Sequence, residues 1–431
     1  MIQKGFKYRL YPNKEQKVFL EKHFGSCRFI YNWGLSKKIK YYEETKKFIS
    51  WVDLNNQLPS LKAEYLWLSE IGSQSLQMEI RNLDTAFKNF FRSKKGFPKF
   101  KKKSNVQSFQ IPDNCGKNYS IEDSKLFIPK LKSGIKIVQH REFKGKFKTL
   151  TISKNPSGQY YVTILVETTD KVIEPKEIKE ETTIGIDLGI KDFLVTSSGE
   201  KIENPKFFIK SQKRLKKIQQ KHSRKQKGSN NKNKSRIKVA KFHLKISNQR
   251  KDFLHKLSKR LISENQTICL EDLNVKGMMQ NRKLSKSIGD VSWSNFTSNL
   301  NYKATWYGIN LITIGRFDPS TKLCNVCGSI KEGLTLKDRE WICSCGTKHD
   351  RDINAAINIK NFGLTKVDYT NLKLNNTVGS TEINACQIRA DIIHSGQEDT
   401  TLKSCITSQV LNMNKNILIL QMRELKKLCL I

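Results

Sequence analysis

Three acidic residues occupy positions where a carboxylate is costly, and they are the first sign of chemistry in this sequence. Asp187 lies inside the apolar run 184–189, Glu271 ends a short apolar run, and Asp352 lies at the start of an Ala-rich segment with a helical pattern. A carboxylate in a buried strand is unfavourable unless it is paired, protonated or bound to a metal. The acids at the helix start also have a simpler explanation, because they would cap the helix and favour its dipole.

Taken together, the three acids indicate a metal site. Carboxylates that converge on one point repel one another, so a shared site needs a cation. Magnesium suits such a site because it prefers hard oxygen ligands and binds phosphates. Two such ions would hold the attacking and leaving oxygens of an in-line phosphodiester displacement. The acids and the basic charge described below therefore predict a nuclease.

Four clustered cysteines predict a second metal site of a different kind. They are Cys324, Cys327, Cys343 and Cys345. The two pairs are separated by 15 residues, and a glycine follows each pair, as a knuckle turn requires. This spacing is typical of a structural zinc ribbon, although the second pair is one residue short. His349 could replace one thiolate, and the alternative without a metal is a knuckle packed as core.

The charge of the chain indicates an anionic partner. The 431 residues include 79 Lys plus Arg and 40 Asp plus Glu, a formal net charge of +39. No window approaches the roughly 18 consecutive apolar residues of a membrane-spanning helix, and the N-terminus lacks an apolar signal core. We therefore expect nucleic acid rather than membrane as the partner. We also expect the cytoplasm or nucleoid as the location, where the ten cysteines would stay reduced.

The basic charge is concentrated in one segment. Between Lys210 and Arg260 there are 20 Lys or Arg residues and a single acid, Asp252. Apolar residues recur there at helical spacing, which predicts basic helices over roughly 206–226 and 232–264. A solvated helix usually mixes charges of both signs. We therefore expect this pair to bind phosphates, and the alternative is a solvated surface.

The remaining pattern predicts an α/β protein of several domains. The expected elements are a strand at 4–11, helices at 13–47 and 53–92, strands between about 105 and 166, and strands at 183–190, 193–202 and 267–273. A hairpin turn is expected at 155–158. The polar, acidic segment 168–181 has the composition of a linker. A helical block is thus predicted to interrupt an N-terminal β domain, and a second α/β domain follows the linker.

At these residues the chain resembles the TnpB family, the RNA-guided DNA endonucleases that certain insertion sequences encode. The family is related to the compact type V CRISPR effectors. The most specific motifs are Gly185-Ile-Asp-Leu-Gly189, Glu271-Asp-Leu-Asn-Val-Lys-Gly-Met278, the two cysteine pairs and His349-Asp-Arg-Asp-Ile-Asn-Ala-Ala356. Weaker matches include Gly96-Phe-Pro-Lys-Phe100 and Trp293-Ser-Asn-Phe296. The likeness extends over about residues 4–388.

The resemblance implies a RuvC-like nuclease domain with an RNase H-like fold and an inserted zinc ribbon, preceded by a β-barrel-like wedge domain with an inserted helical recognition domain. The implied boundaries are 1–12 and 105–175 for the wedge domain, 13–104 for the recognition domain, 176–318 and 349–365 for the nuclease domain, and 319–348 for the zinc ribbon. The family gives no account of the last part of the chain. We expect the tail, 366–431, to be mobile, and its last part, 387–431, to be mobile or bound to RNA.

The resemblance also implies the roles of the site residues. Asp187, Glu271 and Asp352 would be the catalytic acids and the ligands of two magnesium ions, while the four cysteines would hold one structural zinc. Asp352 is chosen over Asp350 because the family's acid directly precedes x-Asn-Ala-Ala. Arg351 and the asparagine of that motif, Asn354, would support the acids or orient the substrate.

The implied partners are a guide RNA derived from the element and target double-stranded DNA. The RNA would read the target by base pairing, next to a short motif read by the protein. Candidate nucleic-acid contacts are Gln77, Lys99, Lys101, Arg214, Lys217, Arg224 and Arg351. A monomer is favoured. Three alternatives stay open: a compact CRISPR effector, a nuclease-inactive RNA-guided repressor, and a transposase with an RNase H fold that needs no RNA.

Overall fold

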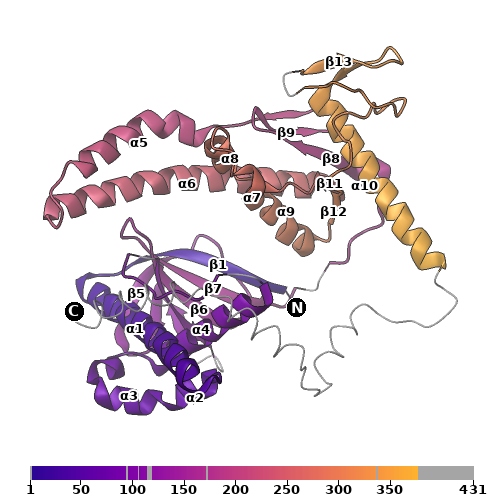
Figure 1. Cartoon of the computed structure of the whole chain (residues 1–431). Helices are drawn as coiled ribbons and strands as arrows, with labels where there is room; N and C mark the ends of the chain where they lie inside the picture. Colours follow the sequence, from indigo (N-terminus) through magenta and orange to yellow (C-terminus); the bar gives the residue numbers. More distant parts are fainter. Residues whose placement is uncertain are drawn as a thin grey trace. The chain divides into compact units, whose positions relative to one another are not determined.

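The computed structural model describes residues 2–93, 96–104, 106–113, 119–170, 173–335 and 338–376. These residues form an α/β structure with a seven-stranded sheet, a five-stranded sheet and a two-stranded hairpin (Figure 1). None of the helices in these ranges combines the length and the apolar character that crossing a membrane requires.

The seven-stranded sheet is built from the N-terminal part of the chain and is antiparallel throughout. Its order is β2-β6-β7-β1-β5-β4-β3. The strands are β1 (Ile2–Tyr11), β2 (Gln107–Pro112), β3 (Ser120–Glu122), β4 (Lys125–Ile128), β5 (Leu131–Val138), β6 (Lys146–Lys154) and β7 (Tyr160–Thr168). The predicted hairpin is confirmed, because β6 and β7 pair and the Asn155 side chain accepts hydrogen bonds from two backbone N–H groups of the turn. The order has two ends, so barrel closure stays a prediction.

Helices separate β1 from β2 in the sequence. They are α1 (Lys14–Thr45), α2 (Trp51–Asn56), α3 (Leu58–Glu64), the 3-10 helix η1 (Leu66–Glu70) and α4 (Ser73–Ser93). The single helix expected over 53–92 is divided, since Pro59 has no N–H to donate and lies in the first turn of α3. Buried side chains of these helices, including Leu20 and Leu76, share one core with strand residues such as Phe109 and Ile164.

The five-stranded sheet contains two of the three predicted acids. Its order is β10-β9-β8-β11-β12. The strands are β8 (Thr183–Leu188), β9 (Asp192–Thr196), β10 (Lys201–Glu203), β11 (Thr267–Glu271) and β12 (Asn310–Ile314). Strand β11 runs parallel to both β8 and β12, whereas β9 is antiparallel to β8 and to β10. Parallel pairing of β8 and β11 brings the ends of both strands to one edge of the sheet.

Helices cover both faces of this sheet. The helices of this part are α5 (Phe207–Ser223), α6 (Asn230–Glu264), α7 (Val275–Met278), α8 (Ser285–Val291), α9 (Trp293–Tyr307) and α10 (Arg351–Asn376). Ile186 and Leu270 belong to the face that packs against α6 and α9. Cys269 and Ile314 belong to the opposite face, where they cluster with Ile359 of α10. The alternation of side chains along each strand thus supplies two apolar faces.

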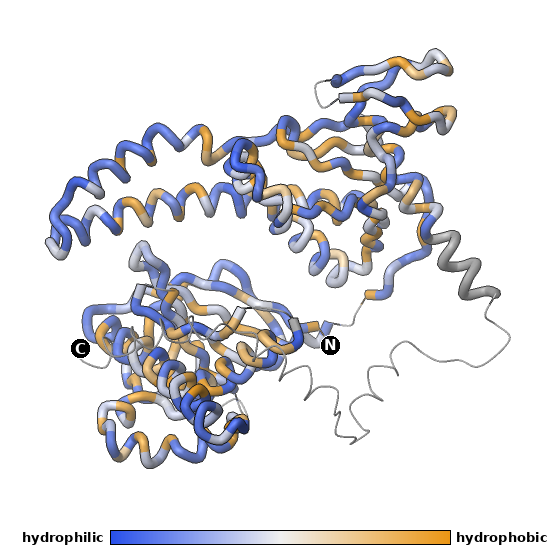
Figure 2. The backbone as a smooth tube through the Cα atoms, in the orientation of Figure 1, coloured by the Kyte–Doolittle hydropathy of each residue, from blue (hydrophilic) through white to orange (hydrophobic). Residues whose placement is uncertain are grey.

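The two basic helices predicted from the sequence are confirmed as α5 and α6. They pack against each other as a long hairpin (Figure 1). Figure 2 shows mainly hydrophilic residues along α5 and around the turn that joins it to α6. Ser229 caps α6 by accepting a hydrogen bond from the backbone N–H of Lys232 at 3.1 Å.

The cysteine segment lies between β12 and α10 in the sequence. It contains the antiparallel hairpin of β13 (Glu340–Ile342) and β14 (Lys348–Asp350), and β14 leads directly into α10. Helix α10 runs to Asn376, past the boundary expected at 365. Residues 377–431, which make up most of the predicted tail, lie outside the described residues.

Candidate active site and zinc centre

Asp187 and Glu271 project from the same face of the five-stranded sheet. The register of β8 and β11 places Cys269 beside Gly185. Asp187 and Glu271 each lie two residues further along these parallel strands, so they share the face of Gly185 and Cys269. That is the face covered by α10, the helix whose first turn carries Asp352.

The close approach of α10 to the sheet depends on two glycines. A Cβ atom on Gly185 would lie 2.1 Å from the carbonyl oxygen of Ala356, and one on Gly363 would lie 2.3 Å from Sγ of Cys269. One glycine belongs to the sheet and the other to the helix, and neither leaves room for a side chain. Their contacts fix α10 against β8 and β11, and thereby bring Asp352 towards the other two acids.

Asp187 interacts electrostatically with both other acids. Burial raises the pKa of Asp187 to about 7, and the negative charges of Glu271 and Asp352 act in the same direction, while Arg351 opposes them. The structure therefore brings the three predicted acids into one neighbourhood. A partly buried carboxylate beside two others is an environment that a divalent cation would relieve.

Glu271 and the acid that follows it have different surroundings. Oε1 of Glu271 accepts a hydrogen bond from Oγ of Ser320 at 2.5 Å. Ser320 is itself buried, and its carbonyl oxygen accepts from Asn358 of α10. Asp272 is instead exposed and pairs with Arg316. Ser320 thus orients Glu271, whereas the charge of Asp272 is used at the surface.

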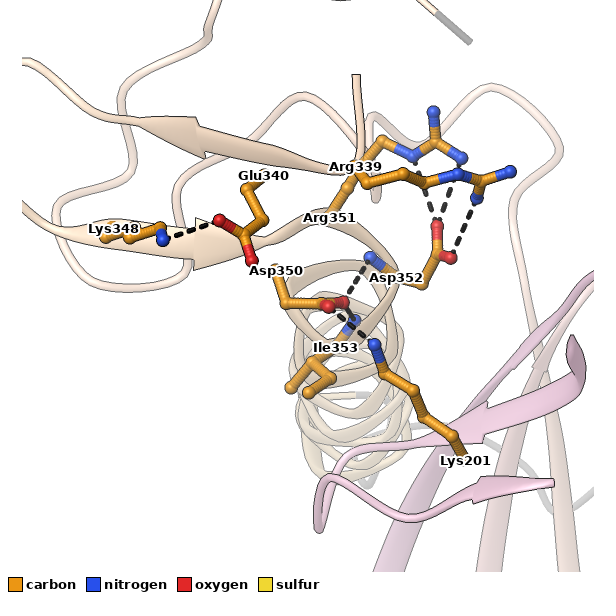
Figure 3. A network of polar contacts seen from close by, with 8 residues as sticks. All are labelled: Lys201, Arg339, Glu340, Lys348, Asp350, Arg351, Asp352 and Ile353. Carbon is orange, nitrogen blue, oxygen red and sulfur yellow. Dashed lines mark hydrogen bonds and ion pairs between the residues drawn. The ribbon is translucent and has the colours of Figure 1, made fainter. Parts of the chain in front are cut away.

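Asp350 and Asp352 have separate partners (Figure 3). Oδ1 of Asp350 accepts from the backbone N–H groups of Asp352 and Ile353, each at 3.1 Å, so Asp350 caps α10. Its Oδ2 pairs with Lys201 of β10. Although burial acts the other way, the hydrogen bond from Lys201 holds the pKa of Asp350 below its usual value. Asp350 therefore has a structural role, and the charge that reaches Asp187 is that of Asp352.

Two arginines hold the Asp352 carboxylate (Figure 3). Arg351 donates to Oδ1 through Nε at 3.1 Å, and Arg339 donates to Oδ2 through Nη1 at 3.0 Å. Arg351 also donates to the carbonyl oxygen of Thr335, and its side chain is only 10% exposed. The guanidinium of Arg351 thus supports Asp352. Two roles were expected for Arg351 from the sequence, supporting the acids or orienting the substrate, and this contact is consistent with the first.

The three carboxylates have the chemistry of a magnesium site, because they offer the oxygen ligands that magnesium prefers. In the described ranges, however, one group of at least three Cys, His, Asp or Glu residues has all its ligand atoms within 4.8 Å of one another. That group is the cysteine quartet. The carboxylate oxygens are therefore spaced more widely than the thiols. The residues that would hold magnesium are Asp187, Glu271 and Asp352.

The four cysteines predicted as zinc ligands are gathered at one point. Sγ of Cys324 lies 3.9 Å from Sγ of Cys345, and Sγ of Cys327 lies 3.5 Å from Sγ of Cys343. Four thiolates around a tetrahedral zinc, each about 2.3 Å from the metal, are separated by roughly 3.8 Å. The quartet therefore fits zinc, and the shorter second pair still brings its sulfurs into place.

His349 is a partner of the quartet rather than a member of it. Its Nε2 lies 3.1 Å from Sγ of Cys324, and its ring packs on Trp341 with 4.5 Å between the ring centroids. Cys345, and not His349, is the fourth member of the close group. A histidine N–H beside a thiolate ligand orients the sulfur and tunes its charge.

Asn354 connects the cysteine segment to α10. Its Oδ1 accepts from the backbone N–H of Asn325 at 3.0 Å, and its Nδ2 donates to the carbonyl oxygen of Leu323 at 2.8 Å. The residue is 2% exposed. Both polar atoms are thus used within the protein, which indicates a supporting role rather than contact with substrate.

The seven predicted nucleic-acid contacts fall into two groups. Those that are exposed are Gln77, Lys99, Arg214, Lys217 and Arg224. Lys101 instead pairs with the buried carboxylate of Glu79 and lies over the ring of Tyr31. Arg351 is buried against Asp352. Lys101 and Arg351 thus have partners within the protein, and nucleic-acid contact by any of the seven residues stays a prediction.

Three polar residues near the acids were not anticipated from the sequence. They are Ser320, Arg339 and Lys201, which contact Glu271, Asp352 and Asp350 respectively. Ser320 and Lys201 lie far in the sequence from the acids that they contact. Arg339 lies closer to Asp352 but belongs to no recognisable motif. The one available signal is that Ser320 and Arg339 belong to the segment around the cysteines, next to the motif of Asp352.

Three family models match parts of the chain. They are described as "Probable transposase" over residues 163–282, "Helix-turn-helix domain" over residues 1–47, and "Cas12f1-like, TNB domain" over residues 293–359. The first match contains Asp187 and Glu271, and the third contains Asp352 and the cysteine quartet.

Curated relatives match most of the chain. A protein of Streptomyces pristinaespiralis named "Putative RNA-guided DNA endonuclease" is 39% identical over 367 residues, which cover 84% of this chain and 90% of the relative. The protein InsQ of Escherichia coli K12, named in the same way, is 30% identical over 373 residues, which cover 82% of this chain and 91% of InsQ. Among solved structures, a Cas12f1 in complex with single-guide RNA and target DNA shares the fold, with a TM-score of 0.50 at 14% identity over 84% of this chain and 99% of that one.

Proposed function

This chain belongs to the TnpB family, and on that basis we propose that it is an RNA-guided DNA endonuclease that hydrolyses phosphodiesters at Asp187, Glu271 and Asp352. One observation carries the assignment of the site. Three acids from β8, β11 and α10 converge where α10 meets the sheet, and their mutual repulsion adds to burial in raising the pKa of Asp187 to about 7. This is the electrostatic environment of a carboxylate site for divalent cations.

The residues around the acids have distinct tasks in the proposed reaction. Two magnesium ions, when bound, would activate a water molecule and stabilise the departing oxygen of the DNA strand. Asp187 supplies a carboxylate from which a bound cation would displace the proton into solvent near neutral pH. Ser320 orients Glu271, and Arg351 orients Asp352. These contacts place the ligand oxygens before substrate arrives, so less reorganisation is needed during the reaction.

We propose the domain assignments that the resemblance implied. The RuvC-like nuclease domain comprises 176–318 and 349–365, with the zinc ribbon at 319–348. Zinc at the cysteine quartet would be structural, since four protein ligands leave no position for water. Through Asn354 the ribbon is connected to the helix that carries Asp352. The zinc would therefore support the active site without taking part in the chemistry.

The proposed partners are a guide RNA from the element's own locus and double-stranded DNA, with the protein acting as a monomer in the cytoplasm or nucleoid. The charge of +39 is suited to covering a guide, a hybrid and a displaced strand. Exposed basic residues on α5, including Arg214 and Lys217, are suited to phosphate contacts. Such contacts position a nucleic acid and do not read its sequence.

The test of guiding is to sequence the RNA that co-purifies with the full-length protein expressed from its own locus. The proposal predicts one discrete RNA with a constant part and a variable 3′ part. The Asp187→Ala variant is the matched control. It should retain the same RNA, because the substitution removes an acid of the metal site and not a residue proposed to bind RNA. Random cellular RNA bound to a folded protein would contradict RNA guiding.

A second function is favoured by the description "Probable transposase" attached to the match at residues 163–282. Several enzymes with an RNase H fold join DNA strands with an acidic triad, so the three acids alone do not separate the two reactions. A strand-transfer assay without RNA distinguishes them. Joined products in that assay would support the transposase, whereas RNA-dependent cleavage without joining supports the endonuclease.

A further inference from the structure

The Asp352 carboxylate is engaged on both oxygens by positive charge. Oδ1 accepts from Nε of Arg351 at 3.1 Å, with Nη2 of the same residue also 3.1 Å away, and Oδ2 accepts from Nη1 of Arg339 at 3.0 Å (Figure 3). These are charge-assisted bonds, the stronger class of hydrogen bond. A metal ligand in the proposed site is therefore paired with two guanidinium groups.

The two arginines differ in how firmly they are held. The Arg351 side chain is 10% exposed, and its third nitrogen donates to the carbonyl oxygen of Thr335. The Arg339 side chain is 45% exposed and contacts Asp352 through one nitrogen. Arg351 is thus part of the fixed structure, whereas Arg339 can leave Asp352 at small cost, as expected of a partly exposed ion pair.

We propose that Arg339 is a positioning residue that exchanges partners: it pairs with Asp352 before DNA is bound, and with a phosphodiester oxygen of the DNA once Asp352 takes a divalent cation. This inference rests on the proposed function. A guanidinium and a divalent cation at the same carboxylate oxygen repel each other, so they compete for Oδ2. Guanidinium is also the side-chain group best suited to phosphate, which gives Arg339 its second partner.

The exchange couples two binding events. While Arg339 holds Asp352, the affinity of the site for a divalent cation is lowered. When DNA offers a phosphate to Arg339, the carboxylate is released and the affinity rises. Because coupling is reciprocal, the cation must in turn favour DNA binding. The site would therefore acquire its ions mainly when a substrate strand is present.

The probe for this coupling is Fe²⁺, which substitutes for magnesium at oxygen sites and, with ascorbate and peroxide, cuts the backbone near the place where it binds. The full-length protein with its RNA is titrated with Fe²⁺, and fragments ending near residues 187, 271 and 352 are quantified. Arg339→Ala should reach half-maximal cutting at an Fe²⁺ concentration at least about fivefold lower than the unchanged protein needs. A fivefold shift is the low end of typical coupling between sites. Arg339→Lys should fall between Arg339→Ala and the unchanged protein.

A matched control lies in the β13–β14 hairpin, which begins directly after Arg339. Lys348 pairs with Glu340 on the surface and has no contact with Asp352 in the described residues, so Lys348→Ala should leave the Fe²⁺ midpoint unchanged. All Arg339 variants keep the backbone bond from Arg351 N to the carbonyl oxygen of residue 339. Thermal melting of each variant confirms that the hairpin is intact.

Adding target DNA with an uncleavable linkage at the cut site completes the test. DNA should lower the Fe²⁺ midpoint of the unchanged protein by a similar factor, and should lower that of Arg339→Ala much less. Equal midpoints for the unchanged protein and Arg339→Ala without DNA would overturn the inference, as would an equal effect of DNA on both. Asp352→Asn tests the underlying site. If it is still cut at the same positions, the proposed metal site is wrong, and not only the role of Arg339.

Discussion

A Cβ atom on Gly185 would lie 2.1 Å from the carbonyl oxygen of Ala356, so β8 and α10 touch backbone to backbone at this point. Asp187 lies two residues after Gly185 on β8, and Asp352 lies one turn before Ala356 on α10. The contact between the glycine and the helix therefore fixes the separation of two of the three acids. The position of the site depends on a residue that has no side chain.

Gly185→Ala should separate α10 from the sheet. The added methyl group meets backbone, which cannot move aside as a side chain can, so we expect a loss of stability of about 3 kcal/mol or more, and loss of DNA cleavage. Urea unfolding and a cleavage assay measure the two effects. Gly289→Ala in α8 is the matched control, because its Cβ would meet only Met279 at 3.7 Å. Unchanged stability of Gly185→Ala would show that the close contact is wrong.

The pKa of Asp187 predicts a pH-dependent stability without magnesium. Because the folded-state pKa is raised to about 7, the folded protein binds more protons than the unfolded chain between about pH 4 and pH 7. The contribution of Asp187 to stability therefore falls as pH rises through this window. Asp187→Asn removes the effect, so it should stabilise the protein at pH 8 by up to about 4 kcal/mol and by little at pH 4.

Thermal unfolding of the zinc-loaded protein at several pH values, in buffer without added magnesium, measures this difference. Magnesium should then stabilise the unchanged protein at pH 8 and should have little effect on Asp187→Asn. An Asp187→Asn variant that is equally destabilised at both pH values would contradict the raised pKa.

The cysteine quartet predicts one zinc per chain, held without His349. Cys345→Ser should lose most of the metal and lower the folded yield, since binding of a structural zinc is coupled to folding of its segment. His349→Ala should keep the zinc with an affinity roughly 10- to 100-fold lower, as expected of a partner that hydrogen-bonds to a ligand. Elemental analysis and competition with a chromogenic chelator distinguish the variants. The reverse order of zinc loss would make His349 the fourth ligand.

Asn354→Ala should loosen the connection between the cysteine segment and α10. The substitution leaves the backbone N–H of Asn325 without its partner, at a cost of about 1–3 kcal/mol, whereas the carbonyl oxygen of Leu323 keeps a hydrogen bond from Nδ2 of Asn358. Faster hydrogen exchange at residues 323–327, with zinc retained, is the expected result. Asn361→Ala, on an exposed position of the same helix, is the control. Equal exchange rates in both variants would remove the role given to Asn354.

Local patterns in the sequence were enough to predict the elements that carry the site. The alternation around Asp187, the apolar run before Glu271 and the Ala-rich start of α10 correspond to β8, β11 and α10. The basic helices were also predicted with nearly correct ends, because their apolar positions recur at helical spacing. The cysteine quartet followed from spacing alone, since its ligands lie within one short segment.

Contacts between distant segments could not be predicted in this way. Ser320 lies 49 residues from Glu271, and nothing in its own surroundings marks it as a partner of an acid. Strand β12 was missed because five residues with no clear period become a strand only by pairing with β11. Arg339 and Lys201 are ordinary surface-type residues in the sequence, and their roles arise from how β13 and β10 lie near the start of α10.

The most direct test is RNA-programmed DNA cleavage by four variants. In each variant, one carboxylate oxygen of one side chain is replaced by an amide nitrogen. Asp187→Asn, Glu271→Gln and Asp352→Asn should bind guide RNA and target DNA but cleave at least about a thousandfold more slowly, as expected when a ligand of a catalytic metal is lost. Asp350→Asn should cleave at nearly the normal rate, because asparagine also caps a helix. Normal cleavage by Asp352→Asn together with loss of cleavage by Asp350→Asn would contradict the assigned active site.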